Sequence, residues 1–137
     1  MRISVETQGH YDFQDITGEV LRVVQEQDIS NGVVHLFVRG STAALTTMEF
    51  EPGLVQDLTE VFEGWGAENA DYHHNQRWGD KNGAAHIKSS ILGCDLSFPI
   101  EDGQALLGTW QQIVLIDFDE RPRTREIVVT LLPAALE

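Results

Sequence analysis

The sequence has one cysteine and only two lysines among its 137 residues. A single thiol cannot form an intrachain disulfide, complete a zinc ribbon or make a redox pair, so Cys94 is expected to be a small buried apolar residue. Acidic residues outnumber basic ones 22 to 9, which gives a formal net charge of −13. A surface this negative argues against binding to nucleic acid or to an anionic membrane, because both need a positive field.

Long hydrophobic runs are also missing. No stretch approaches the roughly 20 apolar residues that span a bilayer, and the first residues alternate in polarity instead of forming a signal peptide. We therefore expect a cytoplasmic protein with no membrane partner. The apolar content is ordinary and 137 residues suffice for one core, which predicts a single domain over residues 1–137.

Hydrophobic periodicity predicts a chain dominated by strands. Strands are expected at residues 2–7, 11–14, 33–38, 43–50, 96–100, 105–107, 113–118 and 126–132. Helical spacing predicts a helix capped by Thr17, a second that starts at Pro52, and a short third over residues 84–92. Residues 66–83 are polar and rich in Gly and Asn, which predicts a long ordered loop. Short turns between strands favour an α+β fold with mixed or antiparallel sheets and about three helices.

Residues 72–93 gather three of the five histidines and both lysines. His74 and His86 are twelve residues apart, and each can ligate a metal or transfer protons near neutral pH. The alternative is that each makes one structural hydrogen bond. Their spacing matches no standard zinc signature. A set of two histidines and one carboxylate, from Glu49 or Asp80, stays open.

Hydroxyls and a cation that suit a phosphate occur in two places, and side chains that suit a flat ring occur in a third. Lys88 and Ser89 lie beside the predicted helix, although an exposed lysine with a surface serine explains the pair equally well. Thr42 belongs to a second donor-rich turn. Trp110 and Gln111 interrupt the alternation between two strands, where they can stack on a flat ring and read its edge, or fill a bulge with a core tryptophan.

Several segments, in this order, closely resemble the YjbQ-like family over nearly the whole chain. They are S-T-A-A-L-T-T-M-E, Y-H-H, A-H-I-K-S-S-I-L-G, P-I-E-D-G-Q and L-G-T-W-Q-Q-I-V-L-I-D-F-D-E-R-P-R. Members are often labelled secondary thiamine-phosphate synthases. The resemblance implies a compact α+β β-sandwich assembled as a homotrimer. The family pattern falls on Thr42, Glu49, Tyr72, His74, His86, Lys88, Ser89, Gly108, Thr109, Trp110 and Gln111.

The reaction that this resemblance implies joins a pyrimidine diphosphate to a thiazole phosphate and releases pyrophosphate. The partner is then a small phosphorylated molecule, and the cofactor, which the sequence does not identify, is Mg²⁺ or another divalent metal. The residues from His86 to Ser89 are expected to form one wall of a pocket, with Glu49 and the segment from Thr109 to Gln111 as the others. His86, His74 and Glu49 are the expected catalytic residues.

The sequence departs from the family pattern before the Ser-Thr pair. Many members have a histidine where this chain has Gly40, and asparagines where it has Met48 and Phe50. The loss of that histidine removes a third imidazole, which favours an anion site over a metal site at His74 and His86. A metal-dependent hydrolase and a non-catalytic ligand-binding trimer are the alternatives to a synthase.

Overall fold

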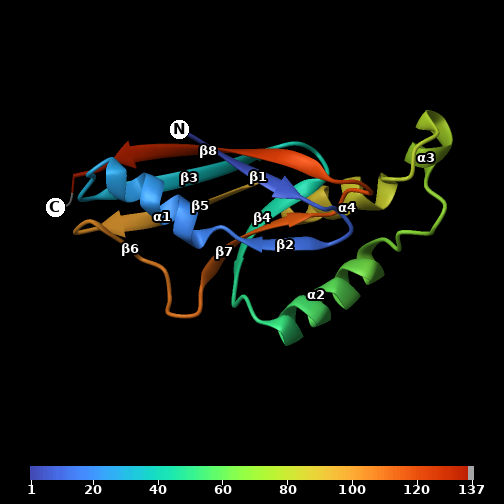
Figure 1. Cartoon of the computed structure of the whole chain (residues 1–137), viewed down its shortest axis with the longest axis horizontal. Coiled ribbons are helices and arrows are strands. Elements are labelled where there is room, and N and C mark those ends of the chain that lie inside the picture. Colours follow the sequence, from blue (N-terminus) through green and yellow to red (C-terminus); the bar gives the residue numbers. More distant parts are fainter. Residues whose placement is uncertain (136–137) are drawn as a thin grey trace.

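Two antiparallel sheets face each other in the computed structural model, which describes residues 1–135 (Figure 1). The five-stranded sheet has the order β1 (Arg2–Thr7), β8 (Arg123–Pro133), β3 (Gly32–Arg39), β5 (Asp95–Glu101) and β6 (Gln104–Ala105). The three-stranded sheet has the order β2 (Asp12–Asp15), β7 (Gln112–Asp117) and β4 (Ala43–Met48). Four helices join them: α1 (Thr17–Glu26), α2 (Pro52–Trp65), α3 (His73–Trp78) and α4 (Gly83–Leu92).

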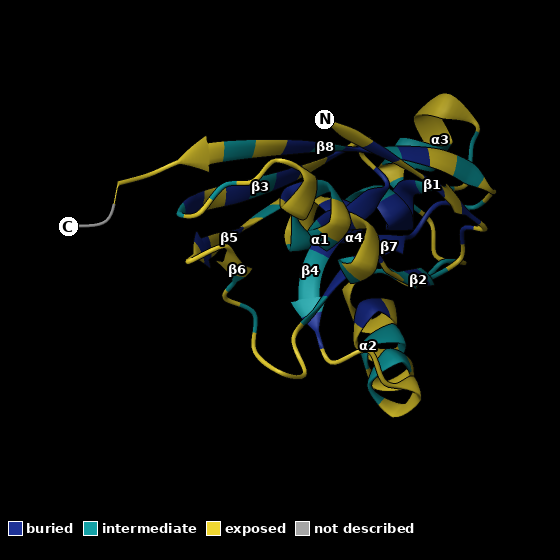
Figure 2. Ribbon diagram, turned by 60° about the vertical axis from the view of Figure 1, so that its left-hand side comes forward, coloured by how far each residue is buried: buried dark blue, intermediate teal, exposed yellow. Residues whose placement is uncertain are grey.

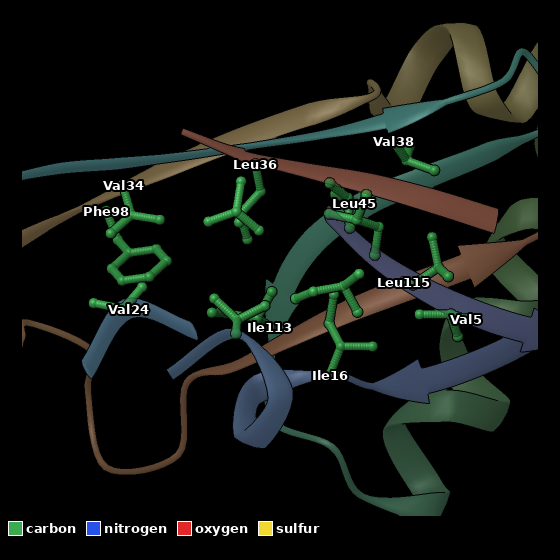
Figure 3. Close-up of a cluster of buried hydrophobic side chains, with 14 of the residues drawn as sticks. Val5, Ile16, Val24, Val34, Leu36, Val38, Leu45, Phe98, Ile113 and Leu115 are labelled. Atoms are coloured by element: carbon green, nitrogen blue, oxygen red, sulfur yellow. The ribbon is translucent and has the colours of Figure 1, made fainter. Parts of the chain in front are cut away.

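The apolar side chains explain the layers. One cluster fills the space between the two sheets and is closed by α1; Figure 3 shows Val34, Leu36 and Phe98 approaching Ile113. A second cluster lies on the other face of the smaller sheet, where Phe62 of α2 and Ala85 of α4 cover it. The central strand β7 is buried on both faces, so its sequence is apolar without a break from Ile113 to Ile116, where a half-buried strand alternates.

The predicted α+β sandwich is confirmed, with four helices where about three were expected and with every strand pair antiparallel. α2 begins at Pro52, and the carboxylate of Glu51 accepts hydrogen bonds from the N–H groups of Gly53 and Leu54. Thr17 is the first residue of α1 and not its cap, because the preceding Ile16 holds that position. The predicted loop at 66–83 was wrong at residues 73–78, which form α3.

A buried ion pair connects the two sheets. Arg125 of β8 donates from Nε and one terminal nitrogen to the two oxygens of Asp117 on β7, at 2.7 and 2.8 Å. The same terminal nitrogen donates to the hydroxyl of Thr42, and Thr7 donates to Asp117 at 2.5 Å. Both members are buried, so each charge depends on the other for compensation.

No helix among residues 1–135 is long and apolar enough to cross a membrane.

We expect Arg125→Met to lower the free energy of unfolding by about 3–5 kcal/mol, because it leaves the Asp117 carboxylate buried without a counter-charge. Urea unfolding of the purified protein measures this. The control is Arg2→Met, which removes an exposed ion pair with Glu126 and should cost less than about 1 kcal/mol. Equal losses in the two variants would show that the buried pair contributes no more than a surface one.

Candidate acid–base site

The fold brings His74 and His86 together. His74 lies in α3 and His86 in α4, and their ring centroids are 4.5 Å apart at an interplanar angle of 42°. The chain can return between the two helices because Gly79 ends α3 with a φ of 71°, in the left-handed region that favours glycine. Gly83 then approaches Tyr72 so closely that a Cβ atom would lie 3.0 Å from its side chain.

The local contacts of His74 indicate which nitrogen carries its proton. Nδ1 lies 3.2 Å from the side-chain oxygen of Asn75 and 3.2 Å from Oδ1 of Asp80. Two acceptor oxygens at one nitrogen favour a hydrogen there, so Nε2 of the neutral ring is left to accept a proton. The Asp80 oxygen is out of hydrogen-bonding alignment and has no other partner.

His86 sits in a more enclosed position. Burial lowers the pKa of His86 below its ordinary value, and the charge of nearby His74 lowers it further. The carboxylates of Asp119 and Asp80 and a hydrogen bond to the backbone of Ser41 act in the opposite direction but are outweighed. His86 is therefore a neutral imidazole at pH 7, the form that accepts a proton or binds a metal.

Asp119 supports this site from the side of the sheets. Its carboxylate accepts hydrogen bonds from Thr42 at 2.8 Å and from Arg123 at 3.0 Å, and Asn82 lies within 3.4 Å. Burial opposes its charge, but the hydrogen bonds from Thr42 and Glu120 and the guanidinium of Arg123 hold the pKa of Asp119 below its ordinary value. A negative charge is thus fixed behind the two imidazoles.

The histidine pair lines one hollow, and a second hollow shares Tyr72 with it. The histidine hollow, of about 440 Å³, is mostly apolar and is lined by Tyr72, His73, His74, Gly83, His86, Ile87, Ser90 and Ile91. The polar hollow, of about 420 Å³, lies over Phe118 and the first turn of α4. It carries the carboxylates of Glu68, Asp71, Asp80 and Glu120, together with Lys81 and Asn82.

Three of the predicted phosphate ligands point into the protein. The side chain of Lys88 is 1% exposed and lies 3.3 Å from a carboxylate oxygen of Glu63. Ser89 donates to the backbone oxygen of Ala43 at 2.6 Å, and Thr42 is buried between Arg125 and Asp119. Their phosphate-binding role stays a prediction, and each already has a partner within the fold.

The predicted common pocket is wrong within one chain. The backbone contact of His86 is to Ser41, before β4 begins, whereas Glu49 follows the end of that strand. Six strand residues span roughly 20 Å. Glu49 and Trp110 line a separate hollow of about 400 Å³, and Figures 1 and 2 place the β6–β7 connection and α3 at opposite ends of the molecule.

The β6–β7 connection does not match one of its two interpretations, a bulge filled by a core tryptophan. Trp110 is 73% exposed, so it is no core residue, and stacking on a ligand stays open. Gln111 donates to Thr47 at 3.1 Å and accepts from the backbone N–H of Gly108. These two hydrogen bonds occupy the amide that was expected to read the edge of a ring. Thr109 is exposed.

A metal site receives limited support. Among residues 1–135 no group of three or more His, Cys, Asp or Glu side chains is arranged to hold a metal ion. Two imidazoles and Asp80 do come together, but Glu49 does not join them. A metal at His74 and His86 would need a further ligand from outside this arrangement.

Several residues that support this region from other parts of the chain were not singled out from the sequence. Asp119, with Arg123 bonded to it, lies near His86, and Tyr11 and Glu63 contact Lys88. The only available signal was an acidic or aromatic residue beside a strand or within a helix, which is common to many surfaces.

We expect His86 to titrate below its ordinary pKa of about 6.5, and His74→Ala to raise that pKa by removing a neighbouring charge and admitting water. Proton NMR titration of the imidazole measures both. The folded state then binds fewer protons at His86 than the unfolded chain, so this contribution to stability holds above about pH 6.5 and is lost as the pH falls through the folded pKa. The control His35→Ala, on β3, should leave the titration unchanged.

The family model described as UPF0047 protein YjbQ-like matches residues 1–134. A UPF0047 protein from Archaeoglobus fulgidus is 36% identical over 132 residues, which cover 96% of this chain and 100% of the relative. The UPF0047 protein YugU of Bacillus subtilis is 32% identical and covers 95% of this chain, with 96% of its own length matched.

Solved structures agree. A YbjQ-like protein of unknown function from Sulfolobus solfataricus has a TM-score of 0.88 at 30% identity, covering 98% of this chain and 97% of its own. A YjbQ/UPF0047 family protein from Clostridium acetobutylicum has a TM-score of 0.86 at 32% identity, covering 96% and 99%. The family match spans nearly the whole chain, and the protein belongs to the UPF0047, or YjbQ-like, family.

Proposed function

We propose that the protein is a cytoplasmic enzyme that transforms a phosphorylated small molecule, with His86 and His74 as its proton-transfer pair. Thiamine-phosphate synthase activity is the form that the family resemblance names. The observation that carries the proposal is the pair of imidazoles 4.5 Å apart beside an open hollow. One of them has a lowered pKa, so two like groups in different environments divide the roles of acid and base.

The polar hollow supports a phosphorylated ligand. The first turn of α4 lines it with Ala84 and Ala85, and backbone N–H groups at a helix start favour an anion. Its four carboxylates would repel a bare diphosphate, so the hollow suits a diphosphate that arrives with Mg²⁺. Mg²⁺ would neutralise the leaving group, while the two histidines act beside it.

In the synthase reaction, the ring nitrogen of the thiazole forms a bond to the methylene carbon of the pyrimidine. The bond from that carbon to the diphosphate oxygen breaks, and its electron pair leaves with pyrophosphate. Once Nε2 of His74 has taken up a proton, it can donate that proton to the departing oxygen and then recover another from the solvent. The apolar walls of the histidine hollow, including Ile87 and Ile91, suit the flat rings.

We expect His86→Ala to reduce kcat at least about 100-fold, because a positioned acid or base typically contributes that much. Release of pyrophosphate from a pyrimidine diphosphate and a thiazole phosphate, with Mg²⁺ present, measures the rate. His35→Ala serves as the control because its ring bonds to Asp95 on the five-stranded sheet, away from the histidine pair. Unchanged kcat in His86→Ala contradicts the site. Ligand-induced thermal protection without turnover by the wild type favours a non-catalytic binding protein.

A metal-dependent hydrolase is the second candidate, because His74, His86 and Asp80 lie together. It requires a metal that lowers the pKa of a bound water. Elemental analysis of the purified protein, followed by hydrolysis assays with and without added divalent ions, separates it from the synthase. A metal that depends on both histidines would favour the hydrolase.

We also infer a homotrimer, as the family resemblance implies. Large apolar side chains are exposed on and beside α2, among them Val61 at 50%, Trp65 at 38% and Ile91 at 58%. Val61 and Trp65 line an apolar hollow of about 330 Å³ between α2 and β4. A patch of this kind normally marks an interface.

Val61→Glu is expected to dissociate the trimer, because a carboxylate would be buried in an apolar contact. Sedimentation equilibrium should give three times the chain mass of 15.3 kDa for the wild type and a smaller assembly for the variant. Glu60→Gln, at an exposed position of the same helix, is the matched control. A monomeric wild type at micromolar concentration would contradict the assembly.

A further inference from the structure

Lys88 is a buried charged side chain of the candidate region that the proposed chemistry does not use. Its ammonium donates to the phenol oxygen of Tyr11, lies 3.3 Å from Glu63 and stands 4.5 Å from the centre of the Tyr11 ring. The Tyr11 hydroxyl in turn donates to the same Glu63 oxygen. Ammonium, phenol and carboxylate thus close a triangle in which each polar group has a partner.

The three members come from distant parts of the chain. Lys88 belongs to α4 and Glu63 to α2, and Tyr11 precedes β2. Tyr11 is held by aromatic contacts to Phe62 and Phe118, with ring centroids 6.3 and 5.9 Å away. The triangle therefore fastens α4 to α2 and to the β1–β2 connection.

The backbone beside Tyr11 indicates that these contacts are strong. His10 and Tyr11 have φ values of 54° and 62°, in the left-handed region that non-glycine residues rarely adopt. Such strain persists only where surrounding contacts fix the conformation, and it is found most often near functional sites. His10 is also tied down, since its N–H donates to the backbone oxygen of Asp119 at 2.7 Å.

Protonation states fit the same geometry. Burial and the nearby Glu63 raise the pKa of Tyr11, so the phenol keeps its hydrogen and donates it. Burial opposes the charge of Glu63, yet the hydrogen bonds from Tyr11 and Lys88 outweigh it and leave the pKa of Glu63 below its ordinary value. Glu63 is thus a carboxylate at neutral pH.

Lys88 and His86 lie two residues apart on α4, and side chains at this spacing point to different sides of a helix. The triangle holds one side of α4 inward, and the other side carries His86 beside His74. We propose that Lys88 is a positioning residue that fixes α4 and hence His86, and that its ammonium does not bind the phosphate of the ligand. The positioning role rests on the proposed function, because His86 is the group positioned.

The different exposure of the two charges makes the proposal testable by stability alone. Lys88 is 1% exposed and Glu63 is 43% exposed. Glu63→Gln leaves the ammonium of Lys88 buried without a counter-charge, so we expect it to lower the melting temperature by about 10 °C. Lys88→Met leaves a carboxylate that can turn to water and should cost clearly less. The double variant should be more stable than Glu63→Gln, and Glu60→Gln, the exposed control on α2, should match the wild type.

If Lys88 instead extends into solvent to bind phosphate, the variants rank differently in melting temperature, and Glu63→Gln has no effect on it. That order, or a double variant less stable than Glu63→Gln, would overturn the proposal. Tyr11→Phe gives an independent variant should Lys88→Met fail to fold. It removes one oxygen from the triangle and should raise the NMR titration midpoint of His86, because a loosened α4 admits water to the imidazole.

Ligand binding separates this proposal from the proposed function. In Lys88→Met, calorimetry with Mg²⁺ and inorganic pyrophosphate should give a Kd within about twofold of the wild type, while kcat falls and KM changes little. A Kd raised tenfold in a variant that keeps its melting temperature would assign Lys88 to the ligand. Absence of binding and turnover in the wild type would count against the proposed function only. The ranking of the variants by melting temperature and the NMR titration midpoint of His86 would still decide the role of Lys88.

Discussion

The contact between Arg125 and Asp117 constrains the rest of this structure. It joins a strand of the larger sheet to the central strand of the smaller one, through two hydrogen bonds of 2.7 and 2.8 Å. With Asp119 and Arg123 alongside, two carboxylates meet two guanidinium groups, so the interior charge is balanced. Apolar packing alone permits the sheets to slide, whereas a bidentate pair has one geometry. The relative position of the sheets is therefore fixed at the edge where the histidines gather.

This polar network continues into the candidate site. Thr42 accepts from Arg125 and donates to Asp119, and its neighbour Ser41 contacts His86 through the backbone. Asn82, which precedes α4, lies 3.4 Å from Asp119. The start of β4, the start of α4 and the turn after β7 are thus linked to one another. His86 obtains its low pKa from burial in this arrangement, so the chemistry of the imidazole depends on how the sheets are joined.

Strands and long helices could be predicted because burial leaves a period in the sequence. β3 and β8 alternate, β7 is apolar from Ile113 to Ile116 because both of its faces are covered, and Pro52 marks the start of α2. α3 has six residues and no buried side chain, so it leaves no apolar period to detect. Figure 2 shows this helix at the surface. The glycines near this helix indicate a loop equally well. The turn between the helices depends on the φ of Gly79 and on the approach of Gly83 to Tyr72, which only the structure shows.

The site could be predicted in its residue types but not in its grouping. His74 and His86 come together although twelve residues separate them, while Lys88 and Ser89, which follow His86 directly, turn into the protein. A buried lysine that pairs with a carboxylate of the fold and a lysine that binds phosphate are the same letter in a sequence, and the difference is the solvent exposure of the lysine side chain. Glu49 and Trp110 lie beyond the far end of β4, at a distance set by the rise of the strand. A strand of that length cannot bend to bring them to the histidines, so any site that uses both groups must draw them from different copies of the chain.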